Sequence, residues 1–367
     1  MSGFLKTKSR TFVLYFFAMD IALYRKYRPQ SFAEALGQEH IVKALQEALK
    51  GGNITHAYLF YGSRGTGKTT FARILAREIG CLPEDLYEID AASNRGIDEI
   101  RALRESVKTL PFRSPYKVYI IDEVHMLTKD AFNALLKTLE EPPKHVVFVL
   151  ATTEFGKLPD TVVSRCQHFT FKKPSQKILK ESVLSIAGKE GFSMDASSAD
   201  LIATLGDGSF RDAQMALQKV LHSVSGKKIT LDDVEKVSSA PSHVLVNELI
   251  GALAESNLGA GLAVVRKAAE QNIDFSLFVK LILKKVRFIL LLRYAPDTKT
   301  FIGNELSPDD NAFVENMAKG GGKALNSGIL LALLDVHAAI PRAYIPQLPL
   351  ELALIKLLEE HTNASNM

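Results

Sequence analysis

The sequence is poor in cysteine and has no long apolar run. Two cysteines among 367 residues exclude a disulfide framework and a four-cysteine zinc site. They fit a reducing, cytoplasmic setting. The apolar run at residues 288–292 stops at Arg293, far short of the ~18–20 residues that a membrane span needs, so we expect no membrane contact. The net charge of +4 permits a polyanionic partner without requiring one.

The first 18 residues need separate treatment. Three basic residues, Lys6, Lys8 and Arg10, precede an apolar stretch from residue 12 to residue 18. The shape is that of a weak signal peptide, but the apolar stretch is short and no clear cleavage site follows. We interpret residues 1–18 as an N-terminal extension, either disordered or a product of start-codon choice, with Met19 as the natural start.

Short apolar runs alternate with amphipathic stretches between residues 20 and 171. Residues 57–61, 118–121 and 146–151 have the character of buried strands, and residues 69–79 carry apolar side chains at helical spacing. Strands that alternate with helices predict a parallel sheet covered on both faces, with ligands bound at the carboxyl ends of the strands. We therefore expect an α/β domain over residues 19–174.

After Pro174 the sequence changes to helical patterns. Residues 175–238 contain no strand-like run and are punctuated by glycines, which predicts a small helical domain. Residues 239–367 are rich in leucine and alanine, and we expect them to form an all-α third domain. Its expected helical stretches are 245–253, 260–269, 275–292, 324–340 and 350–358.

The run from Gly62 to Thr69 matches the pattern G-x-x-x-x-G-K-[ST] in full, between an expected strand and an expected helix. Glycines let the backbone curl so that N–H groups point at phosphate oxygens, and the start of the helix adds positive potential. Lys68 would reach the β- and γ-phosphates, and the Thr69 hydroxyl would bind Mg²⁺. The predicted phosphate-binding residues are Gly62, Ser63, Arg64, Gly65, Thr66, Gly67, Lys68, Thr69 and Thr70.

Two carboxylates, Asp122 and Glu123, follow the expected strand at 118–121. Asp122 is suited to hold Mg²⁺, directly or through water. Glu123 is suited to polarise the water that attacks the γ-phosphate. Acidic pairs are common at solvated strand ends, so the pair alone does not indicate a catalytic site. The phosphate loop upstream favours the catalytic interpretation. Together the two motifs predict hydrolysis of a nucleoside triphosphate and not only its binding.

Further segments surround these motifs in a fixed order. They are Tyr24-Arg-Lys-Tyr-Arg-Pro29, Leu36-Gly-Gln-Glu-His40, Asp122-Glu-Val-His125, Phe132-Asn-Ala-Leu-Leu-Lys-Thr-Leu-Glu-Glu-Pro-Pro143, Ala151-Thr-Thr153 and Ser164-Arg-Cys166. The ordered set resembles the clamp-loader ATPases of the AAA+ superfamily, and among them the gamma/tau type of bacterial DNA polymerase III. The resemblance covers about residues 20–360. It implies an AAA+ P-loop domain, a helical lid domain over 175–238 and a helical collar domain over 239–367.

The resemblance also implies roles near the base and the γ-phosphate. Arg25, Arg28 and Pro29 would lie near the adenine, although a basic surface turn is the alternative. Thr153 would be the sensor-1 residue, whose hydroxyl meets the γ-phosphate or the attacking water. Thr152 is the fallback for that role, and a plain strand cap is the alternative for both threonines.

Two arginines complete the catalytic set that the resemblance implies beside Lys68, Glu123 and Thr153. Arg165 would be an arginine finger that acts in trans on the nucleotide of a neighbouring subunit, where its rigid guanidinium meets developing phosphoryl charge. Arg211 would be the sensor-2 residue, which couples the γ-phosphate to the lid. The alternatives are a surface ion pair for Arg165 and a helix-end arginine for Arg211.

The partners and cofactors follow from the same resemblance. Such a chain would join other clamp-loader subunits in a hetero-pentamer, use ATP and Mg²⁺ to open a sliding clamp, and load it on primer–template DNA without sequence preference. One feature departs from the gamma/tau pattern, which carries a four-cysteine zinc module after the phosphate-loop helix. Cys81 stands at that place without partner cysteines, so we predict no structural zinc.

Three alternatives stay open. The first is an archaeal or eukaryotic clamp-loader small subunit, because those subunits also lack the zinc module. An AAA+ motor that translocates on DNA is a different class, but residues 239–361 show no strand pair typical of a winged helix. A non-catalytic scaffold subunit of a clamp loader would also keep Ser-Arg-Cys, but intact Lys68, Thr69 and Glu123 argue against it.

Overall fold

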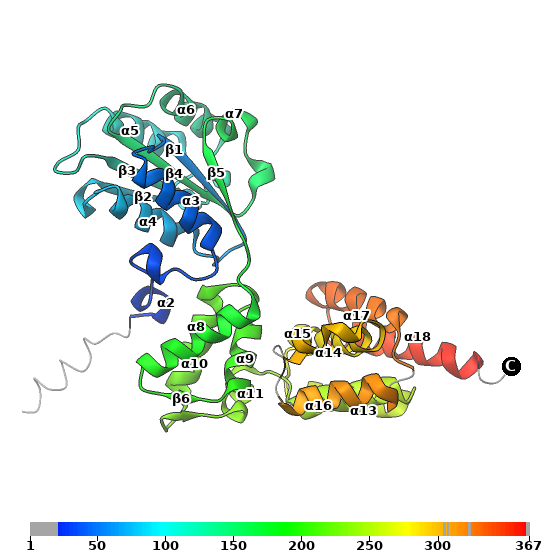
Figure 1. Cartoon of the computed structure of the whole chain (residues 1–367). Helices are drawn as coiled ribbons and strands as arrows, with labels where there is room; N and C mark the ends of the chain where they lie inside the picture. Colours follow the sequence, from blue (N-terminus) through cyan, green and yellow to red (C-terminus); the bar gives the residue numbers. More distant parts are fainter. Residues whose placement is uncertain (1–20, 304–305, 307, 322–323, 365–367) are drawn as a thin grey trace, which may run out of the picture. The chain divides into compact units, whose positions relative to one another are not determined.

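The computed structural model describes residues 21–303, 306, 308–321 and 324–364. The expected N-terminal extension, residues 1–18, lies outside the described residues. The chain forms two compact units, Met1–Leu179 with Gly208–Gln218, and Lys180–Asp207 with Lys219–Met367 (Figure 1). Within the described part of the chain, no helix is both long enough and apolar enough to cross a membrane.

The first unit alternates strands with helices as the sequence predicts. Its α-helices and strands up to residue 171 are α2 (Leu23–Lys26), α3 (Glu39–Lys50), β1 (Ala57–Gly62), α4 (Lys68–Glu78), β2 (Leu86–Asp90), α5 (Ile97–Val107), β3 (Lys117–Asp122), α6 (Lys129–Glu140), β4 (Val146–Thr152), α7 (Asp160–Val163) and β5 (Gln167–Phe171). Short 3₁₀ turns are η1 (Phe32–Glu34), η2 (Pro83–Asp85), η3 (Val124–Met126) and η4 (Phe155–Lys157).

The five strands form one parallel sheet in the order β2-β3-β4-β1-β5. The register pairs Tyr61 of β1 with Thr152 of β4, and Ile121 of β3 with Leu150 of β4. The carboxyl ends of β1, β4 and β3 are therefore neighbours, with β4 in the middle. This order brings the phosphate loop after β1 and the carboxylates at the end of β3 to either side of Thr152.

Two hydrophobic cores cover the faces of the sheet. One core joins alternate strand residues to α5, α6 and α7 through Ile100, Leu135 and Val162. The other joins the intervening strand residues to α3 and α4 through Ile41 and Ile74. Figure 1 shows these two groups of helices on opposite faces. Burial on both faces explains why β4 is buried along its whole length, and the predicted α/β fold class is confirmed.

The rest of the chain is mostly helical. Its α-helices are α8 (Gln176–Lys189), α9 (Ala196–Leu205), α10 (Phe210–Ser223), α11 (Leu231–Ser238), α12 (His243–Ala254), α13 (Leu258–Glu270), α14 (Phe275–Tyr294), α15 (Lys299–Gly303), α16 (Pro308–Asn316), α17 (Ser327–Ala339) and α18 (Leu348–Ala364). Its short elements are β6 (Ser193–Met194), β7 (Lys228–Ile229), η5 (Pro296–Thr298), η6 (Met317–Gly321) and η7 (Ile340–Arg342).

A single hydrophobic core holds the helices from α12 onward together. It includes Leu249, Phe278, Ile289, Leu333 and Leu354. The expected stretches at 245–253, 260–269, 275–292, 324–340 and 350–358 correspond to α12, α13, α14, α17 and α18. The division into lid and collar domains stays a prediction, because the boundary between the two compact units runs through α8 and α10.

Candidate nucleotide-binding site

The loop between β1 and α4 has the backbone curl that the glycine pattern predicts. Gly62, Gly65 and Gly67 all have positive φ, at 149°, 71° and 105°, in the region that favours glycine. A Cβ at Gly62 would overlap the carbonyl oxygen of Phe171, and a Cβ at Gly65 would overlap the hydroxyl of Ser209. The loop therefore depends on glycine for both its conformation and its close packing.

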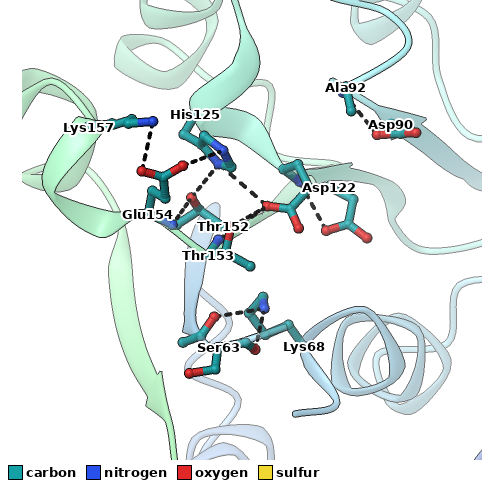
Figure 2. A network of polar contacts seen from close by, with 12 residues as sticks. Ser63, Lys68, Asp90, Ala92, Asp122, His125, Thr152, Thr153, Glu154 and Lys157 are labelled. Atoms are coloured by element: carbon teal, nitrogen blue, oxygen red, sulfur yellow. Dashed lines mark hydrogen bonds and ion pairs between the residues drawn. The ribbon is translucent and has the colours of Figure 1, made fainter. Parts of the chain in front are cut away.

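Lys68 begins α4 and folds back over this loop (Figure 2). Its Nζ donates hydrogen bonds of 2.9 Å each to the carbonyl oxygens of Gly62 and Ser63. Burial lowers the pKa of Lys68, and the nearby carboxylates of Glu123 and Asp122 oppose that shift. The ammonium group thus lies inside the loop, on the side of the two carboxylates.

The two residues predicted to bind Mg²⁺ are in direct contact. Thr69 Oγ1 donates a 2.7 Å hydrogen bond to Asp122 Oδ2. Asp122 Oδ1 accepts a 3.0 Å bond from the N–H of Glu123. A hydroxyl and a carboxylate, both oxygen donors, are the ligands that Mg²⁺ prefers. The residues present therefore fit the ion.

Glu123 faces the end of β4. Its backbone is left-handed, with φ at 50°. Its Oε2 accepts hydrogen bonds from the N–H of Thr153 at 3.2 Å and from the Thr153 hydroxyl at 3.0 Å. The structure thus brings the predicted water-activating residue and the predicted sensor-1 residue together.

The start of α10 contacts the phosphate loop from the other side. The N–H of Phe210 donates a 3.0 Å hydrogen bond to the carbonyl oxygen of Gly65. Next to it, the guanidinium of Arg211 lies over the ring of Tyr24, 4.7 Å from its centroid. The hydroxyl pKa of Tyr24 is lowered by hydrogen bonding to Arg25 first and to Arg211 second. The predicted sensor-2 arginine and the N-terminal basic segment are therefore neighbours.

Arg28 and Pro29 follow α2 and are both half-buried. Burial lowers the pKa of Arg28, and the positive charge of Arg73 on α4 lowers it further, while Glu88 raises it. At the start of this segment, the N–H of Leu23 donates a 3.1 Å hydrogen bond to Gln218 Oε1. This bond also holds residues 23–29 to the rest of the first unit.

Arg165, which follows α7, is not part of this cluster. Its guanidinium donates to Glu140 Oε1 of α6 and to the carbonyl oxygen of Thr161, both at 2.7 Å. About a third of its side chain is exposed. Within one chain, Arg165 makes a surface ion pair, so its action on another subunit's nucleotide stays a prediction.

The comparisons with known proteins point to one family. A family model described as "DNA polymerase III, delta subunit" matches residues 37–95 and 83–175. The DNA polymerase III subunit tau of Bacillus subtilis is 37% identical over 368 aligned residues, which cover 94% of this chain and 65% of that protein. The tau subunit of Escherichia coli is 36% identical, over 78% of this chain and 47% of that protein. Over most of its length, the chain is similar to gamma/tau subunits of DNA polymerase III.

The chain spans less than two thirds of the length of these curated relatives. Among solved structures, the branch-migration motor RuvB of Thermotoga maritima is similar at a TM-score of 0.51 and 24% identity, over 62% of this chain and 80% of RuvB. That likeness shows the fold alone and nothing about the activity.

Cys81 is buried after α4. Burial raises the pKa of the Cys81 thiol to about 11, and its Sγ lies 3.5 Å from the carbonyl oxygen of Leu82. In the described ranges, no group of three or more histidine, cysteine, aspartate or glutamate side chains is arranged to hold a metal ion. The absence of a structural zinc stays a prediction.

Three residues of the site had no assigned role in the sequence analysis. Gln38 is buried, and its side-chain amide bonds both the carbonyl oxygen and the N–H of Lys172, at 2.8 Å and 3.2 Å. Ser209 packs against Gly65. His125 lies between Glu123 and Glu154. Gln38 and His125 stood inside the quoted motifs, whereas nothing in the sequence indicates that Ser209 meets a glycine 144 positions earlier.

Proposed function

We propose that this chain binds ATP with Mg²⁺ in the loop 62–69 and hydrolyses it as a clamp-loader subunit of DNA polymerase III. One observation carries the proposal: hydrogen bonds join Thr69 to Asp122 and Thr153 to Glu123 at the ends of adjacent strands, beside the phosphate loop. The similarity to gamma/tau subunits of DNA polymerase III supports the assignment.

Binding of the triphosphate would change the partners of Lys68. Its ammonium now bonds two neutral carbonyl oxygens. Phosphate oxygens carry full charge and make stronger, charge-assisted bonds, so they would draw Lys68 away from those carbonyls. Thr69 and Asp122 would hold Mg²⁺, which when bound neutralises charge on the phosphate oxygens. The start of α4 would contribute its N–H groups and its positive potential.

Hydrolysis needs a water held in line with the γ-phosphate. Glu123 would orient that water with Oε1, because Oε2 is occupied by Thr153. Thr153 would hold the carboxylate in place and, through its hydroxyl, respond to the γ-phosphate. Arg211 would contact the γ-phosphate from α10, whose first residues already lie on the phosphate loop.

Arg165 would act on the nucleotide of a neighbouring subunit. Its ion pair with Glu140 is on the surface of α6, where such pairs contribute little stability and are easily exchanged. A guanidinium so weakly held can leave Glu140 for a phosphate. We propose that the chain works in a hetero-pentamer in the cytoplasm, opens a sliding clamp and contacts primer–template DNA through its phosphates.

The test is the rate of ATP hydrolysis by the chain with and without primed DNA, sliding clamp and candidate partner subunits. We expect full turnover only in the complete assembly. Lys68→Ala should lower it by about 10²–10³-fold, the usual cost of losing one charge-stabilising group. Lys236→Ala is the matched control, because Lys236 is an exposed lysine paired with Asp232.

Two other results would contradict the proposed function. An assembly whose turnover is unaltered by Lys68→Ala would make the chain a non-catalytic scaffold. A chain that tracks along duplex DNA without partner subunits would make it a DNA-translocating motor.

A further inference from the structure

His125 is a buried histidine with polar groups at both ring nitrogens. Its side chain is only 6% exposed. Its Nδ1 lies 2.9 Å from the Thr152 hydroxyl and 3.4 Å from Glu123 Oε2. Its Nε2 lies 3.4 Å from Glu154 Oε1. Burying polar groups is costly, and an apolar side chain would fill the same space equally well. A histidine with an oxygen beside each ring nitrogen therefore indicates a role beyond packing.

Three consecutive residues at the end of β4 organise this cluster. Thr152 contacts His125, Thr153 bonds Glu123, and Glu154 contacts His125 from the far side (Figure 2). The Thr152 hydroxyl is itself fixed, because Thr152 is fully buried and its Oγ1 accepts a 3.0 Å bond from the N–H of Glu154. The imidazole is thus held by β4 and reaches back to β3.

We propose that His125 is a positioning residue for Glu123, and that Glu154 is the residue that orients His125. The inference rests on the proposed hydrolytic role of Glu123. The Glu123 carboxylate is held on its Oε2 side by Thr153 and by the imidazole, which leaves Oε1 directed to the water. Without the imidazole, Thr153 alone would hold the carboxylate, which could then rotate about its bond to Thr153.

Glu154 connects this arrangement to the surface. Its side chain is 45% exposed and forms a 2.7 Å ion pair with Lys157 of η4. Glu123 is therefore connected to a surface carboxylate through two contacts, one from Glu123 to His125 and one from His125 to Glu154. The charged and polar groups that face His125 are Glu123, which follows β3, Thr152 at the end of β4, and Glu154 just after β4, with Lys157 behind Glu154.

The kinetic test uses the full assembly with partner subunits, clamp and primed DNA. His125→Leu removes both ring nitrogens at similar volume, and we expect kcat to fall by about 10- to 100-fold, the usual cost of losing a group that orients a reacting side chain. The KM for ATP should stay within twofold, because His125 does not reach the phosphate loop. His125→Asn places an amide near the position of Nδ1 and should recover most of the loss. Glu154→Gln should give a smaller loss of the same kind.

The matched control is His145→Leu. His145 is also a partly buried histidine of the first unit, but its Nε2 contacts the backbone carbonyl oxygens of Val107 and Thr109. It should leave kcat unchanged. A His125→Leu variant that folds and keeps kcat within twofold of the original would overturn the proposal. So would a loss confined to KM, or a loss that His125→Asn does not recover.

A second measurement is independent of turnover. The ¹⁵N resonances of the His125 ring, assigned by their disappearance in His125→Asn, are followed in the original chain, Glu123→Gln and Glu154→Gln. We expect Glu123→Gln to shift Nδ1 and Glu154→Gln to shift Nε2. Unchanged ring resonances in both variants would overturn the proposal even if the assembly hydrolyses ATP. An assembly that does not hydrolyse ATP would instead overturn the proposed function, while the ring resonances still decide whether the contacts exist.

Discussion

Thr69 Oγ1 and Asp122 Oδ2 are 2.7 Å apart, although the two residues are separated by 53 positions in the chain. The bond joins the first turn of α4 to the end of β3. It places two oxygen donors from different elements at one point beside the phosphate loop. Under the proposed function, these two oxygens hold Mg²⁺.

Thr69→Val tests that relationship, because valine has the shape of threonine without the hydroxyl. We expect the Mg²⁺ concentration for half-maximal ATP hydrolysis to rise by about 10-fold or more, in line with the loss of one oxygen ligand. Thr69→Ser keeps the hydroxyl and should behave almost like the original chain. Equal Mg²⁺ dependence in the valine and serine variants would contradict the assignment.

Arg165→Ala should preserve ATP binding and lower DNA-stimulated hydrolysis in the assembly, by at most ~10³–10⁵-fold for a lost arginine finger. Glu140→Ala is the control. It breaks the same 2.7 Å ion pair but leaves the guanidinium in place, so turnover should be kept. Mixing the Arg165→Ala chain with Lys68→Ala chains reports on action in trans. Unchanged turnover of the Arg165→Ala assembly would show that this arginine has no such role.

Asp85 gives a prediction about stability. It is buried beneath the segment between α5 and β3, and its carboxylate accepts hydrogen bonds from the N–H groups of Phe112, Arg113 and Ser114 at 2.6, 3.1 and 3.0 Å. Asp85→Ala leaves these donors without an acceptor, and the free energy of unfolding should fall by roughly 2–3 kcal/mol. The exposed Asp98→Ala should change it by less than about 0.5 kcal/mol. Urea titration of both variants measures the difference.

The same residue sets the direction of a pH dependence. Burial raises the pKa of the Asp85 carboxyl, but the three backbone hydrogen bonds and the Ser114 side chain together outweigh burial and hold that pKa well below its usual range. The carboxyl of an unfolded chain titrates near ~3.9. Asp85 therefore stabilises the fold above about pH 4, and this contribution is lost as the pH falls toward the folded-state pKa. Stability of Asp85→Ala should fall less steeply below pH 4 than that of the original chain.

Zinc content is a simple check on Cys81. We expect negligible bound zinc, because Cys81 is buried and its thiol has a raised pKa of about 11, which disfavours the thiolate that zinc requires. Elemental analysis of the purified chain measures the metal directly. About one zinc per chain would contradict the expectation.

The sequence was most informative where motif and periodicity agreed. The phosphate loop, the carboxylates at the end of β3 and the three central strands lie where they were predicted, because β1, β3 and β4 are buried on both faces and carry continuous apolar runs. The strands β2 and β5 were not predicted. They lie at the edges of the sheet and keep several exposed side chains, so neither shows a continuous apolar run.

Contacts between distant segments could not be predicted from the sequence. The two-residue strands β6 and β7 form in a region expected to lack strands. They pair residues 35 positions apart, such as Met194 with Ile229, and too few residues take part to leave a pattern in the sequence. The contact of Arg211 with Tyr24 joins α10 to the N-terminal segment. The role of His125 was missed because a histidine within a motif has no periodicity of its own, and only the geometry shows its two carboxylate neighbours.

The central claim is that Glu123, held by Thr153, hydrolyses the ATP that the loop 62–69 binds. The most direct measurement compares ATP affinity and single-turnover hydrolysis for the original chain and Glu123→Gln in the same reconstituted assembly. We predict equal affinity within about threefold and a rate lowered by about 10²–10⁴-fold, the range for a lost general base. Equal rates for the two chains, or no ATP binding by either, would contradict the account.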